Sequence, residues 1–126
     1  MEDFFYTGLA TGIALLTYYF TLIKSGSARG KFGGQAPSHD GPVEYLRYVR
    51  AHQNTLEHLV IFLPALWLFS LAVDPFWGAT ISLLWPLGRM LYALGYYQSA
   101  EKRMPGLIIS MLPLYILVLG GFFGCA

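Results

Sequence analysis

The side chains of this chain that could do chemistry gather in two blocks set within otherwise apolar sequence. The first block runs from Glu44 to His58. At about 100° per residue its polar members fall within about one quadrant of an α-helix: Arg47, Arg50, Asn54, Glu57 and His58. The polar members of the second block also share one helical face if the third helix extends past the membrane, at offsets of 0, 3, 7 and 14: Arg89, Tyr92, Tyr96 and Arg103. A polar face on an apolar helix must meet something polar, so the two blocks indicate contact with each other or with a bound ligand.

Lipid is the solvent that the composition indicates. Of the 126 residues, 56% are hydrophobic and 12% are charged, whereas a soluble domain carries about 25% charged residues. The formal net charge of +1 implies no polyanionic partner such as a nucleic acid. Cys125 is the single cysteine, so the sequence predicts no internal disulfide and no cysteine-based metal site.

Four apolar segments are each long enough to cross about 30 Å of hydrocarbon, which takes about 20 helical residues. They run from about Phe4 to Ile23, Pro42 to Val73, Phe76 to Tyr97 and Pro105 to Phe123. Backbone groups in lipid must be satisfied within their own segment, so helices rather than strands are expected. The fold class predicted for residues 1–126 is therefore all-α: a single integral membrane domain that forms a four-helix bundle with four transmembrane helices.

The connections between these segments predict how the chain lies in the membrane. Residues 25–41 read as a polar loop, Asp40-Gly41-Pro42 is typical of a helix start, and Asp74-Pro75 is typical of a tight turn. Lys and Arg gather near the first and third connections, and the opposite side has only Glu2, Asp3 and Asp74. The positive-inside rule then places both basic loops in the cytoplasm and both termini on the opposite side.

Simpler roles are open to several of these residues. Glu57 with Arg89 or Arg50 could form a buried ion pair that sets the register of two helices. Tyr92 and Tyr96 could belong to the aromatic belt at the membrane surface. His52 and His58 have no cysteine or carboxylate set of metal-ligand spacing near them, so no metal is expected.

Two stretches of the sequence resemble the MAPEG superfamily, the membrane-associated proteins in eicosanoid and glutathione metabolism. Glu44-Tyr45-x-Arg47-x-x-Arg50-Ala51-His52-x-Asn54-x-x-Glu57 is similar to the glutathione-site helix of that family. Gly88-Arg89-x-x-Tyr92-x-x-Gly95-Tyr96 is similar to its third-helix block. Arg103 lies where the leukotriene-forming members place the arginine that activates the thiol. The similarity extends from Ser27 through the fourth apolar segment.

The resemblance implies a homotrimer with one glutathione at each subunit interface, in contact with membrane lipid. Arg103 would be the catalytic residue, and its subunit would also supply glutathione ligands: Arg50, Asn54, Glu57, His58, Tyr92 and Tyr96. The neighbouring subunit would supply Arg29 and His52. Arg47 and Arg89 would support the site, and Tyr115 would contact the lipophilic substrate, an electrophile or a lipid hydroperoxide. This active site would lie on the cytoplasmic side and hold no metal.

Several positions depart from the family pattern in ways that bear on specificity. His52 stands where the leukotriene-forming members have glutamine, His58 where they have tyrosine, and Tyr115 where they have tryptophan. Gly30 replaces a second arginine. These changes favour a general glutathione transferase, with peroxidase activity as a possible addition. The alternatives are a non-catalytic lipid-binding scaffold of the same fold and a small channel or transporter subunit.

Overall fold

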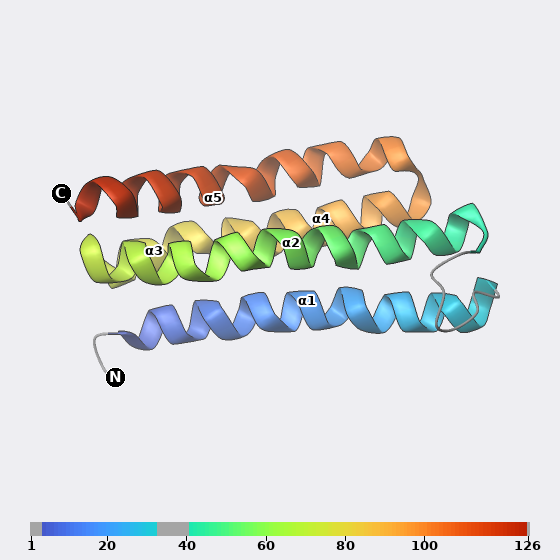
Figure 1. Ribbon diagram of the computed structural model, residues 1–126, viewed down its shortest axis with the longest axis horizontal. Helices are drawn as coiled ribbons and strands as arrows, with labels where there is room; N and C mark the ends of the chain where they lie inside the picture. Colours follow the sequence, from blue (N-terminus) through green and yellow to red (C-terminus); the bar gives the residue numbers. More distant parts are fainter. Residues whose placement is uncertain (1–3, 33–40, 126) are drawn as a thin grey trace.

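The computed structural model describes residues 4–32 and 41–125, and all regular structure in these two stretches is helical. In chain order the elements are α1 (Phe5–Phe32), α2 (Val43–Ala72), α3 (Pro75–Ser82), α4 (Leu84–Gln98), the short 3-10 helix η2 (Ala100–Arg103) and α5 (Met104–Gly124). They form a bundle of four antiparallel rods, because α3 and α4 follow one another along a single rod (Figure 1). The predicted four-helix bundle is confirmed.

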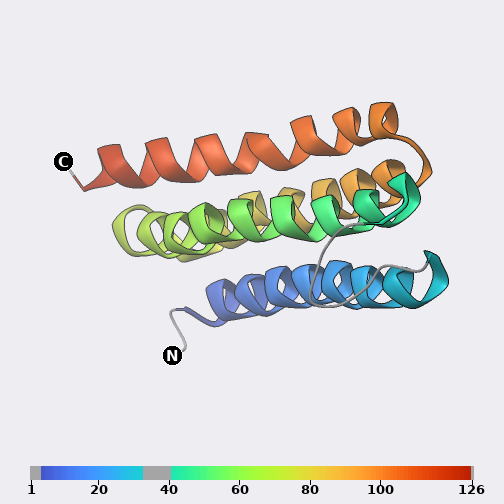
Figure 2. The same cartoon turned by 45° about the vertical axis from the view of Figure 1, so that its right-hand side comes forward.

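The rods are arranged with α1 and α5 on opposite sides of α2 (Figures 1 and 2). The end of α1, the start of α2 and the connection from α4 to α5 lie together at one end of the bundle. Three segments of the described chain are long and apolar enough to cross a membrane: Phe5–Phe32, Val43–Ala72 and Ala100–Gly124. Because the first and third connections meet at one end of the bundle, the basic residues near them lie at the same end of the molecule.

Helix α1 is longer than the sequence predicts. The stretch from Ser25 onward was expected to be loop because it is rich in Gly and Ser, yet the helix continues to Phe32. Ser25 and Ala28 are buried, and Ala28 packs in a cluster with Tyr45 and Val49 of α2. Tertiary packing against α2 thus outweighs the weak helix propensity of this stretch.

The third rod is broken where a single helix was expected. Helix α3 ends at Ser82, Leu83 lies in a turn, and α4 begins at Leu84. Pro86 accounts for the break, because it has no N–H to donate to the Ser82 carbonyl and its ring clashes with that group. The two pieces have 8 and 15 residues, so neither alone reaches the length of a membrane span.

Two helix starts can be compared with their predictions. The expected tight turn at Asp74-Pro75 joins α2 to α3, and Asp74 also caps α3: its side chain accepts a hydrogen bond of 2.9 Å from the Trp77 backbone N–H, and Pro75 follows in the first turn. For α2 the N-cap position is Pro42, and no side chain among residues 4–32 and 41–125 caps the helix. The expected cap Asp40 lies outside the described residues, as do Glu2 and Asp3.

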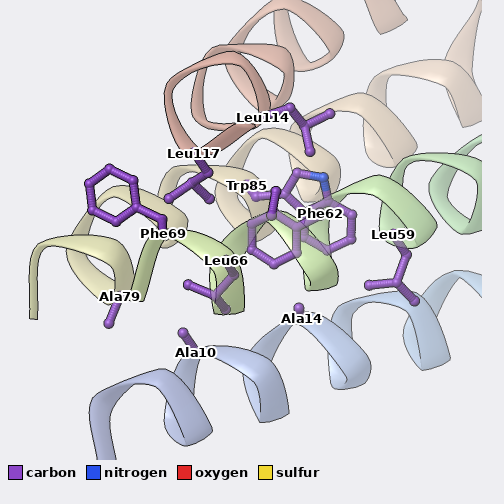
Figure 3. Packing of buried hydrophobic residues seen from close by; sticks show 11 residues of the cluster. Ala10, Ala14, Leu59, Phe62, Leu66, Phe69, Ala79, Trp85, Leu114 and Leu117 are labelled. Carbon is purple, nitrogen blue, oxygen red and sulfur yellow. The ribbon is translucent and has the colours of Figure 1, made fainter. Parts of the chain in front are cut away.

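The core lies where all four rods meet. Phe62 of α2 stacks on Trp85 of α4, with ring centroids 4.5 Å apart and planes at 13° (Figure 3). Ala10 and Ala14 let α1 approach this pair, and the other buried members of the cluster surround it: Leu59, Ala65, Leu66, Phe69, Ala79, Leu114 and Leu117. Large apolar side chains also cover the outside, such as Leu16 and Phe122, which are 69% and 66% exposed. Such a surface suits lipid rather than water.

The backbones of α4 and α5 approach closely at glycines. A Cβ atom on Gly88 would lie 2.5 Å from the Ser110 backbone nitrogen, and one on Gly106 would collide with the Tyr92 backbone. By contrast, Cβ atoms on Gly8 and Gly12 of α1 would meet nothing within 4 Å in the described chain. Close packing therefore holds α5 against the helix that carries Arg89 and Tyr92.

Candidate functional site

A fully buried arginine lies at the centre of the polar residues. Arg89 of α4 is 0% exposed, and its guanidinium donates to α2 on one side and to α5 on the other. On α2 its Nη2 donates to Asn54 Oδ1 at 2.7 Å and to Thr55 Oγ1 at 2.9 Å. On α5 its Nη1 donates to Ser110 Oγ at 3.3 Å. Arg89 thus joins three helices through neutral oxygen atoms.

The carboxylate that could have paired with Arg89 does not do so within this chain. The side chain of Glu57 is exposed, whereas Arg89 is enclosed by Asn54, Thr55 and Ser110. The expectation of a Glu57–Arg89 ion pair, and of a buried Glu57, is therefore wrong for the single chain. The two sets of side chains lie about one turn apart on α2. Asn54 and Thr55 face α4 and bind Arg89, whereas Glu57 faces outward.

Two tyrosine rings lie between two arginines along α4 and η2. The Arg89 guanidinium lies 4.1 Å from the centre of the Tyr92 ring, and the Tyr92 and Tyr96 rings meet edge to face at 5.6 Å. The Arg103 guanidinium then lies 5.4 Å from the Tyr96 ring centre, and it donates a hydrogen bond to the Ala100 carbonyl. We call this series of four residues the Arg–Tyr ladder. Helical spacing accounts for Arg89, Tyr92 and Tyr96 along α4. The expected continuous helix to Arg103 is wrong, because α4 ends at Gln98 and Ser99 is extended; η2 brings Arg103 back over Tyr96 instead.

The inner end of the Arg–Tyr ladder is buried and its outer end is open. Tyr92 is 3% exposed, Tyr96 is half-buried and Arg103 is partly exposed. The ladder therefore carries positive charge from the core of the bundle to its basic end.

Two arginines of the first block differ in what they contact. Arg47 donates through Nη1 to the Gln98 carbonyl at 3.2 Å, which links the start of α2 to the end of α4. Arg50 is exposed and donates to Gln53 Oε1 at 3.0 Å on its own helix. The predicted supporting role suits Arg47, and Arg50 lies on the open surface beside the Arg–Tyr ladder.

A groove between α2 and α5 carries His58 and Tyr115. Its volume is about 310 Å³, and apolar side chains complete its lining: Ile61, Met111, Leu114 and Val118. His58 is half-buried, and its Nδ1 is buried with no hydrogen-bond partner among the residues that the structure describes. In those same stretches His, Cys, Asp and Glu form no cluster of three that could hold a metal ion. The groove is thus lined mainly by apolar side chains, and the His58 ring places a polar group in its wall.

Arg29 and His52 lie on the other side of α2. Arg29 of α1 lies over the Tyr45 ring, 5.4 Å from its centre. His52 lies beside Tyr18 of α1, with ring centroids 6.5 Å apart. Since α1 and α5 flank α2 on opposite sides (Figure 2), a single chain separates these two residues from the groove of His58 and Tyr115.

Thr55 and Ser110 are functional contacts that the sequence did not single out. Both hydroxyls donate back to their own helices, Thr55 to the Ala51 carbonyl and Ser110 to the Leu107 carbonyl. Their oxygen lone pairs are therefore directed to accept from Arg89. The sequence carried only a weak signal for these two contacts with Arg89. Thr55 is a hydroxyl residue next to Asn54, and Ser110 is a hydroxyl residue within an apolar segment.

Several known proteins are similar in sequence to this chain. The sequence pattern of the MAPEG family matches residues 7–123. An uncharacterised protein of Synechocystis sp. is 43% identical over 118 residues, which cover 94% of this chain and 86% of that protein. Human microsomal glutathione S-transferase 2 is 35% identical over 108 residues, or 86% of this chain and 73% of the relative. Bovine leukotriene C4 synthase is 35% identical over 104 residues, or 82% and 69% of the two chains.

The family match spans all four rods of the bundle and both polar blocks. It agrees with the resemblance drawn from the two blocks, and the chain belongs to the MAPEG family.

Proposed function

We propose that this protein is a membrane-bound glutathione transferase. It binds glutathione at the interfaces of a homotrimer, stabilises the thiolate and conjugates it to lipophilic electrophiles. The observation that carries the proposal is the Arg–Tyr ladder, which presents Arg103 at the open, basic end of a bundle with an apolar exterior. The names of two relatives, a glutathione S-transferase and a leukotriene C4 synthase, support the same reaction class.

The chemistry of glutathione fits the polar side chains on this face. Glutathione has two carboxylates, an amine and a thiol, and arginine suits carboxylates through paired, charge-assisted hydrogen bonds. Arg50 and Glu57 are exposed in the single chain and can meet a carboxylate and the amine, respectively. Because Asn54 Oδ1 is occupied by Arg89, the amide N–H₂ of Asn54 is the group left to donate to the ligand. Tyr92, Tyr96 and His58 complete the ligand set.

Arg103 is the residue proposed to stabilise the thiolate. A free thiol has a pKa near 8.5, and only the thiolate attacks electrophiles. Lowering that pKa by about two units takes about 2.7 kcal/mol. A guanidinium at 4 Å supplies about 1 kcal/mol in water and about 4 kcal/mol at a partly buried site. The half-buried Tyr96 ring beneath Arg103 provides part of that shielding.

A second copy of the chain is proposed to complete the site. Arg29 and His52 pack on the α1 side of α2, away from the groove of His58 and Tyr115. In a homotrimer the α1 side of one subunit can face the Arg–Tyr ladder of the next. Such packing would also cover the exposed Arg50 and Glu57, which are costly to leave facing lipid.

The groove between α2 and α5 is the proposed entry for the lipophilic substrate. Its apolar lining suits an oily molecule that arrives through the bilayer, and Tyr115 lies on its wall. The same thiolate could reduce a lipid hydroperoxide, so peroxidase activity belongs to the proposal as a secondary reaction.

Two other functions compete with this one. A non-catalytic scaffold of the same fold would bind lipid without needing Arg103, and a channel subunit would use the polar faces to line a pore. Glutathione that binds only the folded protein raises its unfolding temperature. We expect glutathione to stabilise the purified protein in detergent, and both rivals predict no such shift.

The mutation that tests the proposal is Arg103→Ala. Glutathione affinity should stay within a few-fold because the carboxylate contacts remain, while turnover should fall about 10²-fold, matching about 2.7 kcal/mol of lost stabilisation. The ultraviolet absorbance of the bound thiolate should disappear near neutral pH and return at higher pH. Arg103→Lys should recover only part of the activity, since a point charge replaces a planar fork.

Lys102→Ala is the matched control, because it removes the neighbouring positive charge, whose Nζ donates to Gln98 Oε1 at 2.9 Å. Lys102→Ala should keep both the thiolate signal and turnover near the parent values. Arg103→Ala protein that also keeps both would remove Arg103 from the reaction, and Arg29 would be the next candidate.

A further inference from the structure

A second, separate pocket lies at the basic end of the molecule, between α1 and the start of α2. Its volume is about 120 Å³, and its lining combines two lysines, a serine and aromatic rings: Lys24, Ser27, Ala28, Lys31, Phe32 and Tyr48. Apart from Tyr48 and Phe32, its wall is one face of α1, since residues 24, 27, 28 and 31 follow the helical repeat. This pocket shares no residue with the Arg–Tyr ladder or with the groove of His58 and Tyr115.

The pocket lies at the depth of the lipid headgroups. The apolar run of α1 ends at Ile23, and about 20 residues from Phe4 span roughly 30 Å, which is the hydrocarbon thickness. Lys24 therefore stands at the edge of the hydrocarbon, and Lys31 lies roughly 10 Å further along the helix axis. The headgroup layer on each side is roughly 5–7 Å thick. The two lysines thus flank this layer from below and above.

The positive charges of the pocket have no counterion in the described chain. Lys24 lies over the Phe20 ring at 5.6 Å and Lys31 over the Phe32 ring at 5.3 Å, and within residues 4–32 and 41–125 neither pairs with a carboxylate. Lys31 lies in the last turn of α1, where a cation also stabilises the helix end. Lys24 lies two turns earlier, so the helix end does not account for its charge.

Tyr48 makes one wall of the pocket rigid. Its ring stacks flat on Tyr97 of α4, with centroids 3.9 Å apart and planes at 7°, and Phe32 lies against it at 6.0 Å. An aromatic wall beside lysines suits a ligand with an apolar body and an anionic head. The hydroxyl of Ser27, which lies between the two lysines on this face of α1, adds a hydrogen-bond donor to the lining.

We propose that this pocket binds the phosphate group of an anionic phospholipid. Lys24 and Lys31 hold the phosphate oxygens from two sides, Ser27 donates to it, and the acyl chains follow the apolar, exposed face of α1 below Lys24. Negatively charged lipids of the cytoplasmic leaflet match the side on which the basic residues gather. The proposal is independent of the glutathione site, since it uses none of its residues.

Lipid retention tests this proposal. The full chain is reconstituted in vesicles with equal amounts of phosphatidylglycerol and phosphatidylcholine, extracted in detergent and washed in about 1 M salt, where the screening length is about 3 Å. Bound lipid is then quantified by mass spectrometry. We expect retained phosphatidylglycerol to fall about tenfold in Lys24→Gln and in Lys31→Gln, as for the loss of a charge-assisted hydrogen bond.

Lys102→Gln is the matched control, because it removes one exposed lysine at the same end of the bundle but outside the pocket. It should retain phosphatidylglycerol like the parent. Ser27→Ala, which changes no charge, should lower retention a few-fold. Equal retention in Lys24→Gln, Lys31→Gln and Lys102→Gln would overturn the proposal, whether all three fall or none does.

A second arm separates the two sources of a phosphate group. Inorganic phosphate is added to the parent and to Lys24→Gln in phosphatidylcholine vesicles, and the unfolding temperature is measured. A lipid site predicts no stabilisation by inorganic phosphate at millimolar concentration. Stabilisation of the parent alone, without selective retention of phosphatidylglycerol, would overturn the lipid assignment in favour of a soluble phosphate.

Discussion

At the scale of single residues, Arg89 is the position where the physical requirements are strictest. An unpaired charge in an apolar bundle is costly, by about 2.5–3.5 kcal/mol on insertion scales. Here the guanidinium is surrounded by Asn54, Thr55 and Ser110 oxygens and by the face of Tyr92, so its charge is shared among neutral dipoles and a ring. The Arg89 guanidinium can therefore stay charged beneath the candidate site without forming an ion pair with Glu57.

Conservative replacement of Arg89 should therefore be costly. In Arg89→Lys a single ammonium cannot reach α2 and α5 together, and buried acceptors lose their donor at a cost of about 1–3 kcal/mol. We expect a clear fall in unfolding temperature in detergent. Arg47→Lys is the control, since Arg47 makes one bond to the Gln98 carbonyl near the surface and its replacement should cost under about 0.5 kcal/mol. Equal stability of the two variants would contradict the three-helix role of Arg89.

At the scale of elements, the contact between α4 and α5 positions the site. Gly88 and Gly106 let the two backbones meet, which places Ser110 within reach of Arg89 and seats the Tyr92 backbone against α5. The helix pair thus holds the inner end of the Arg–Tyr ladder, while η2 places Arg103 at its outer end.

Filling that contact should separate the two helices. Gly106→Ala places a methyl group against the Tyr92 backbone, where neither partner can yield without a backbone shift, and such overpacking typically costs about 1–3 kcal/mol. The unfolding temperature and glutathione affinity should both fall, because Tyr92 moves. Gly26→Ala is the matched control: its Cβ meets nothing within 4 Å, so the change should be neutral or stabilising by up to about 1 kcal/mol. A Gly106→Ala protein as stable as Gly26→Ala would show that α4 and α5 tolerate a wider spacing.

At the scale of the whole molecule, the polar residues divide between two faces. One face carries the Arg–Tyr ladder with Arg50 and Glu57, and the other carries Arg29 and His52 against α1. A site that uses both faces needs two subunits, so the proposed activity depends on assembly.

Mixed oligomers test this dependence. Arg29→Ala and Arg103→Ala chains should each be inactive alone, and co-expression should restore part of the activity because some interfaces then hold both intact residues. Size-exclusion and tagged co-purification confirm the mixing. Absence of recovery in verified mixed assemblies would place Arg29 outside the site.

Membrane orientation can be measured with cysteine reporters. Cys125 is the single native cysteine and is exposed at the end of α5, so it serves as one reporter. In a Cys125→Ser background, Asp74→Cys should label from the same face as native Cys125, and Gly33→Cys and Lys102→Cys from the opposite, cytoplasmic face. Labelling of Asp74→Cys and Lys102→Cys from one face would contradict the proposed topology.

Local sequence was sufficient for the four rods and for the part of the second polar block that lies on α4, but not for the break between α3 and α4. Hydrophobic runs of about 20 residues predict membrane helices because lipid leaves the backbone no other partner. The part of the ladder from Arg89 to Tyr96 could be predicted because it lies along one helix, where spacing alone sets the face. The position of Arg103 could not, because Ser99 is extended and η2 returns Arg103 to the Tyr96 ring. Where helix propensity was weak, as from Ser25 to Phe32, packing against Tyr45 and Val49 determined the outcome instead.

Contacts between helices could not be predicted from local sequence. Whether Arg89 pairs with Glu57 or with Asn54 depends on the rotation and depth of α2 relative to α4, and both residues lie within one quadrant of the same helix. The stacking of Phe62 on Trp85 joins α2 to α4 and contributes to the register that selects Asn54. The close approach at Gly88 and Gly106 joins α4 to α5 and brings Ser110 to the other side of Arg89. These are long-range packing interactions, so the partner of a buried charge emerges only when all four rods are packed together.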